Sequence, residues 1–81
     1  MIEIVIKFDD FMTRYSFHEW LKEQCNFPSY YGHNLDALYD CLKDNPNFIF
    51  KFIPSMMHHD YEKRVMKTMK EAGCQVEIIQ E

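Results

Sequence analysis

The sequence predicts an α/β fold in which three parallel strands form one sheet packed against helices. Three short segments rich in β-branched or aromatic residues, 2–8, 48–53 and 74–80, have the composition of strands. Between them lie segments, within 16–43 and 59–72, whose apolar residues recur at helical spacing. Strands that alternate with helices are joined by crossovers, so neighbouring strands run parallel. Because three helices cannot easily cover both faces of the sheet, we expect them to cover one face.

Length and composition indicate one small globular domain over residues 1–81. A chain of this size buries about 60–65% of the surface that its unfolded form exposes, so its stability should be modest. Its 47% hydrophobic content, with 16% aromatic residues, supplies a core without crosslinks and argues against disorder. The formal net charge of -4 disfavours direct binding of nucleic acid and favours a basic protein partner. We expect the free chain to be a monomer.

The cysteines and the N-terminal residues indicate a cytoplasmic protein with reduced thiols. Cys25, Cys41 and Cys74 are odd in number and too far apart for a CxxC pair, which disfavours a secreted disulfide framework. The first residues, MIEIVIKF, alternate and include an acid, unlike a signal peptide. No apolar stretch approaches the length of a membrane span, so we expect no membrane association.

The first strand and the first helix are predicted from alternation and from a capping motif. Isoleucine and valine alternate with other residues over 2–8, as in a strand. The first helix is predicted to start at a capping box formed by Ser16 and Glu19 and to run to about Cys25. The segment 26–28, NFP, should end it, because a residue before proline is disfavoured in the α region.

The second half of the chain reads as helix, strand, helix and strand. Asn34 is predicted to cap a helix over about 35–43, which ends at a turn cluster of Asp, Asn and Pro. Residues 48–53, FIFKFI, are aromatic and bounded by turn residues, as in a buried strand. A helix over about 59–72 follows, with Gly73 where a C-cap glycine belongs. Its methionines at helical spacing favour core packing over an adaptable docking surface.

An acidic stripe runs along the predicted second helix. With about 100° per residue, Asp36, Asp40 and Asp44 share one side of the helix. The apolar residues share another side, which we expect to face the core: Leu35, Leu38, Cys41 and Leu42. Like charges four residues apart cost roughly 0.2–0.5 kcal/mol per pair. The helix dipole favours Asp36 in the first turn but not Asp40 or Asp44, so folding does not require the stripe.

Tyrosines flank the acidic stripe. Tyr30 and Tyr31 precede the helix, and Tyr39 lies at the border between its acidic and apolar sides. Carboxylates beside aromatic rings form a surface that imitates a nucleic acid, with carboxylates in place of phosphates and rings in place of bases. The target would then be a protein that grips phosphates with Arg, Lys and His. The simpler interpretation is a solvated helix face beside tyrosines that only pack.

Catalytic and metal sites have little support in the sequence. Cys41 and His33 would suit a thiol nucleophile, but Cys41 falls on the apolar side of its helix, where a buried thiol is inert. The group His58, His59 and Asp60 matches no recognised metal-ligand spacing, and adjacent histidines point to different faces of a helix. With two glycines in the chain, neither a phosphate loop nor a dinucleotide fingerprint exists. We therefore expect neither an enzyme nor a cofactor.

Two stretches, residues 27–42 with the sequence FPSYYGHNLDALYDCL and the later stretch KEAGCQVEII, carry a family resemblance. The first closely resembles the signature of the barstar family, whose members are intracellular inhibitors of secreted bacterial ribonucleases of the barnase type, and the second resembles the final helix and strand of that family. Together they cover about a third of the chain, and the remainder agrees in the order of elements. The resemblance implies a three-stranded parallel sheet with about three to four helices. It also implies inhibition of a basic ribonuclease, whose active site the second helix and the loop before it would plug.

The resemblance also implies a role for each residue at the matching positions. Tyr30 would pack on the catalytic histidine of the nuclease, and Asp40 would replace the substrate phosphate among basic side chains. Asp36 would pair with a nearby basic or polar group. The close backbone approach and the surrounding contact area would come from Gly32, Asn34, Leu35 and Tyr39.

The chain departs from the inhibitor of barnase at three places. Tyr39 stands where that inhibitor has tryptophan, with some loss of contact area. Asp44 and Asn45 replace Gly-Trp, and Thr68 aligns with a glutamate, so two peripheral contacts are altered or absent. One alternative to inhibition of a barnase-type ribonuclease leaves the fold unchanged. In it the chain is a barstar-like module that binds another basic protein, such as a toxin nuclease of different fold or a regulatory partner.

Overall fold

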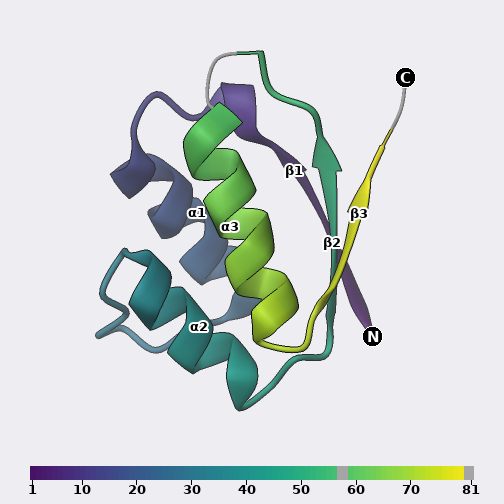
Figure 1. Ribbon diagram of the computed structural model, residues 1–81. Coiled ribbons are helices and arrows are strands. Elements are labelled where there is room, and N and C mark those ends of the chain that lie inside the picture. The colour runs from purple at the N-terminus through teal and green to yellow at the C-terminus, as the bar shows by residue number, and fades with distance from the viewer. Residues whose placement is uncertain (57–58, 80–81) are drawn as a thin grey trace.

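Strands and helices alternate along the chain, as the sequence predicted (Figure 1). The computed structural model describes residues 1–56 and 59–79, without the side chain of His59. In chain order the elements are β1 (Ile2–Lys7), a short 3-10 helix η1 (Phe8–Asp10), α1 (Arg14–Cys25), α2 (Leu35–Lys43), β2 (Phe48–Ile53), α3 (His59–Glu71) and β3 (Gln75–Ile78). The three α-helices lie on one side of the sheet (Figure 1), which confirms the expected α/β arrangement.

The sheet is parallel throughout, with strand order β1-β2-β3. Ile4 of β1 lies opposite Phe50 of β2, and Phe50 lies opposite Val76 of β3. Alternate residues of β1 and β2 are buried beneath the helices, because successive side chains of a strand point to opposite faces. On the other face, Glu3 and Lys51 form an ion pair at 2.9 Å. The sheet therefore has one packed face and one open face.

The core lies between the sheet and the three helices. Each element supplies side chains at its own period, every second residue from the strands and every third or fourth from the helices. The fully buried apolar side chains are Ile6, Phe17, Leu21, Leu38, Leu42, Phe50, Phe52, Val65 and Met69. In the described part of the chain, none of the helices has the length and apolarity that crossing a membrane requires.

Helix α1 starts one turn earlier than predicted. Its N-cap is Thr13, whose Oγ1 accepts a hydrogen bond from the Ser16 N–H at 3.0 Å, while Ser16 Oγ accepts one from the Thr13 N–H at 3.2 Å. The predicted capping box of Ser16 and Glu19 was wrong, because Ser16 already lies inside the helix. Thr13 has the extended backbone of an N-cap, and the Glu19 carboxylate makes other contacts.

Helices α1 and α3 each end at a residue with a left-handed backbone. Helix α1 ends at Cys25, as predicted, but the residue that ends it is Asn26, with φ of 56°, and not the residue before Pro28. Helix α3 ends before Gly73, as predicted, where φ is 97°. A glycine adopts this conformation without the steric cost that other residues incur.

Strands β1 and β3 are shorter than the sequence predicted. Strand β1 ends at Lys7, because the next residue, Phe8, begins the 3-10 helix and turns its ring into the core. Strand β3 covers Gln75–Ile78 of the predicted 74–80, and residue 80 lies outside the described residues. Strand β2 has the predicted bounds.

Candidate functional site

Two aspartates of α2 and the aspartate that caps its C-terminus form an exposed stripe, as the helical spacing predicted. Asp36, Asp40 and Asp44 are exposed. On the opposite side of the helix, Leu38 and Leu42 are fully buried. Packing holds the helix by its apolar side alone, so the carboxylates contribute nothing to the core. The stripe is available to a partner.

Partly exposed side chains border the stripe. Leu35 and Cys41, which we expected on the core side, are only partly buried at the edge of the core. Tyr39 is 38% exposed. The Nζ of Lys43 lies 5.7 Å from the centre of the Tyr39 ring and 3.5 Å from Oδ1 of Asp40. Exposed pairs of this kind contribute little to stability, so Asp40 can exchange Lys43 for a cation on another protein.

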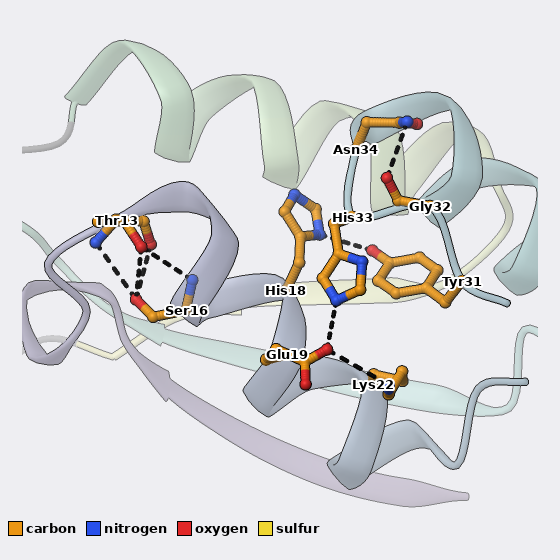
Figure 2. Close-up of polar contacts among 9 residues, drawn as sticks. All are labelled: Thr13, Ser16, His18, Glu19, Lys22, Tyr31, Gly32, His33 and Asn34. Atoms are coloured by element: carbon orange, nitrogen blue, oxygen red, sulfur yellow. Dashed lines mark hydrogen bonds and ion pairs between the residues drawn. The ribbon is translucent and has the colours of Figure 1, made fainter. Parts of the chain in front are cut away.

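Asn34 joins the loop before α2 to the helix itself. As predicted, it is the N-cap, and its Oδ1 accepts a hydrogen bond from the Ala37 N–H at 2.8 Å. Its Nδ2 donates to the Gly32 carbonyl at 3.1 Å (Figure 2). A Cβ at residue 32 would lie 3.3 Å from both Ala37 Cβ and Asn34 Nδ2, so the close approach favours glycine there. One side chain therefore orders both the loop and the first turn.

The two neighbouring tyrosines of the loop have different environments. Tyr30 is 84% exposed, whereas Tyr31 is 4% exposed. The ring of Tyr31 packs on Phe27, with centroids 4.9 Å apart. The Tyr31 hydroxyl forms a hydrogen bond of 2.6 Å with Nδ1 of His18 (Figure 2). Tyr31 thus anchors the loop in the core, and Tyr30 projects from it.

His18 is a buried polar junction that the sequence reasoning missed. Its ring is fully buried, and its Nε2 forms a second hydrogen bond of 2.6 Å with the Tyr61 hydroxyl. The imidazole therefore joins α1 to the loop before α2 and to α3. Burial is the main cause that lowers the pKa of His18 to about 4, and the nearby imidazole of His33 contributes to the same shift. At neutral pH the ring is uncharged, with one nitrogen donating and the other accepting.

His33 joins the loop before α2 to α1, and the sequence reasoning missed this role as well. Its backbone is left-handed, with φ of 55°, and its ring stacks on Tyr15 with centroids 4.5 Å apart. Its Nε2 pairs with the Glu19 carboxylate, which also pairs with Lys22 at 3.3 Å (Figure 2). The hydrogen bonds from His33 and then from Lys22 lower the pKa of Glu19. Nothing in the local sequence pattern signals these contacts, because they join the loop to α1.

Two hollows lie on either side of Asp40. One, of about 430 Å³, lies between α2 and α3 and is lined by Leu35, Asp36, Tyr39, Asp40, Thr68 and Glu71. The other, of about 380 Å³, includes Tyr30, Asp40 and Cys41 in its lining. The structure thus brings Tyr30 and Asp40, ten positions apart in the chain, to the same hollow. The loop and the helix form one continuous acidic and aromatic surface.

The three cysteines are free thiols. Burial raises the pKa of Cys25 to about 12, and it raises those of Cys41 and Cys74 as well. The charges of Asp40 and Asp44 raise the pKa of Cys41 further. Because the thiolate is the nucleophile, none of these groups is poised for attack at neutral pH.

The predicted histidine pair lies largely outside the described residues. Nothing is described of His58, or of the side chain of His59. Among the side chains that the structure describes, no three of His, Cys, Asp or Glu are placed to share a metal ion.

Comparison with known proteins identifies the family of this chain. Residues 1–75 match the family described as "Barstar (barnase inhibitor)". The chain is also 50% identical over 42 residues to a protein of Bacillus subtilis (strain 168) named "Putative ribonuclease inhibitor YrdF". That match covers 52% of this chain and 46% of the relative, so the chain matches about half the length of that protein. The family match, the parallel three-stranded sheet and the acidic second helix agree, and the chain belongs to the barstar family.

Proposed function

We propose that this protein inhibits a ribonuclease of the barnase type by placing α2 and the loop before it in the active site of the nuclease. The observation that carries the proposal is the exposed stripe of Asp36 and Asp40 beside the exposed ring of Tyr30. An RNA-cleaving site of this type binds phosphates through basic side chains and bases through flat surfaces. Carboxylates and a projecting phenol ring satisfy both requirements without a scissile bond.

The roles that we propose for individual residues are those that the family resemblance implies. Asp40, between the two hollows, takes the place of the phosphate, and Asp36 pairs with a second basic or polar group. Tyr30 covers the catalytic histidine. Gly32 and Asn34 let the loop approach closely, while Leu35 and Tyr39 add contact area at the edges of the stripe.

A rigid loop supports tight binding, because less conformational freedom is lost on association. Three contacts restrain the loop before binding: Asn34 joins it to the helix, Tyr31 anchors it in the core, and His33 stacks on α1. The net charge of -4 also favours rapid encounter with a basic target.

Cleavage of a fluorogenic RNA by a barnase-type ribonuclease, titrated with this protein, tests the proposal. We expect stoichiometric inhibition by the wild type. Asp40→Asn should inhibit at least roughly 30-fold more weakly, because Asp40 would be a hot-spot charge that becomes buried in the complex. The matched control is Glu23→Gln, which removes the same charge from an exposed position on α1. It should inhibit like the wild type.

Thermal unfolding of the same variants separates binding from folding. Asp40→Asn should change stability by less than about 0.5 kcal/mol, because the Lys43 pair is exposed and the neighbouring aspartates repel. Large destabilisation with intact inhibition would make Asp40 a structural residue. No inhibition by the wild type at micromolar concentration would favour a different basic partner for the same surface.

A further inference from the structure

The two arginines of the chain, distant in sequence, line one hollow beside the acidic stripe. Arg14 is the first residue of α1, and Arg64 lies on α3. Both helices lie on the same side of the sheet (Figure 1). The hollow has a volume of about 310 Å³, and Asn34 and Asp36 from the start of α2 line it as well. The hollow therefore adjoins the surface that, in our proposal, α2 places in the active site of the nuclease.

Arg14 is held in position before any partner binds. Its Cζ lies 4.3 Å from the centre of the Tyr61 ring, a cation–π contact. The Tyr61 hydroxyl is fixed in turn by its hydrogen bond of 2.6 Å to the buried ring of His18. The positive charges of Arg14 and Arg64 both oppose the rise that burial causes in the pKa of Tyr61. Both guanidinium groups are therefore near this ring.

The guanidinium groups have no carboxylate partner within the part of the chain that is described. The ion pairs among those residues use Lys22, His33, Lys43, Lys51 and Lys67. Arginine presents a planar set of donors that matches a carboxylate with two parallel hydrogen bonds. Two such groups, exposed at the rim of one hollow, form a recognition site for an acidic group.

We propose that this hollow is a specificity site that receives an aspartate or glutamate side chain of the target nuclease. The inference rests on the proposed function, because it assumes that α2 faces a nuclease. Asp36 at the edge of the hollow disfavours a free, multiply charged anion. It suits instead a partner surface on which an acidic side chain lies next to a basic one. A nuclease without that acidic side chain would bury Arg14 and Arg64 unpaired, so the site discriminates between targets.

Inhibition assays with paired substitutions test this site. The double variant Arg14→Gln/Arg64→Gln removes both guanidinium groups, and Lys63→Gln/Lys70→Gln removes two exposed charges of α3 as a matched control. Both variants make the protein more acidic, which by itself strengthens attraction to a basic nuclease. We expect the arginine variant to bind a barnase-type ribonuclease about tenfold or more weakly than the lysine control.

Two further variants identify the contact. Arg14→Lys/Arg64→Lys keeps both charges and should recover part of the affinity, which also shows whether a loss came from misfolding. Acidic residues around the nuclease active site are then changed to amides one at a time. One of these changes should weaken binding to the wild type but not to Arg14→Gln/Arg64→Gln.

Equal affinity of the arginine and lysine variants, with intact inhibition, would overturn the specificity site and leave the proposed function standing. Failure of the wild type to inhibit would remove the proposed function and this inference with it.

Discussion

The buried imidazole of His18 should make the fold sensitive to mild acid. In the native state the ring is fully buried and its pKa lies at about 4, compared with the ordinary value of 6.5. Between these two values the unfolded chain binds a proton at residue 18 that the folded chain does not bind. The free energy of unfolding therefore falls as the pH falls from about 6.5 to about 4, and His18 contributes no pH dependence above that range.

The size of the effect follows from the difference in proton affinity. A tenfold difference corresponds to about 1.4 kcal/mol, so the full effect of His18 is about 3 kcal/mol. Of this, roughly 2 to 3 kcal/mol should be lost by pH 4.5. For a small domain with a total stability of about 5–15 kcal/mol, this is a large fraction. The cause is burial of charge, because a protonated ring could still donate to the hydroxyls of Tyr31 and Tyr61.

Urea unfolding at pH 7 and pH 4.5, followed by the fluorescence of Trp20, the single tryptophan, measures this loss. His18→Gln cannot be charged, so it should lose roughly 2 to 3 kcal/mol less than the wild type over the same interval. The carboxylates titrate in both proteins and cancel in the comparison. His18→Gln is expected to be less stable at pH 7, and only the pH dependence is decisive. Identical pH dependence in the two proteins would refute the assignment of the acid sensitivity to His18.

Two further predictions concern the loop and the charge of the binding surface. Asn34→Ala should lower the free energy of unfolding by about 1 kcal/mol and speed dissociation from the nuclease, because it removes the cap and the bond to Gly32. Asn34→Asp keeps the cap acceptor but loses the hydrogen bond to the Gly32 carbonyl. It should therefore retain stability in urea unfolding yet dissociate faster from the nuclease. An unchanged dissociation rate would show that this hydrogen bond does not order the loop. The association rate with a basic nuclease, measured by stopped flow, should fall steeply with added salt because of the -4 charge. A rate independent of salt would contradict electrostatic steering by the acidic surface.

Local sequence signals determined the order of the elements and the main features of α2. The alternation in FIFKFI, the cap at Asn34 and the glycine at residue 73 all act within a few residues, so they can be read without knowledge of the fold. The same holds for the stripe of Asp36 and Asp40, because helical geometry alone places them on one side. Local signals failed where two caps competed, since Thr13 and Ser16 both suit the start of α1.

Tertiary structure decided which side chains of the loop are buried and which project. A loop has no period, so the residue pattern did not distinguish the exposed Tyr30 from the buried Tyr31, and only the family resemblance singled out Tyr30. His18, the hydrogen-bond partner of Tyr31, lies on α1, and so does Tyr15, on which the His33 ring stacks. Arg14 and Arg64 meet in one hollow only because α1 and α3 pack on the same face of the sheet. Such contacts join residues far apart in the chain, and they exist only once the sheet has brought the helices together.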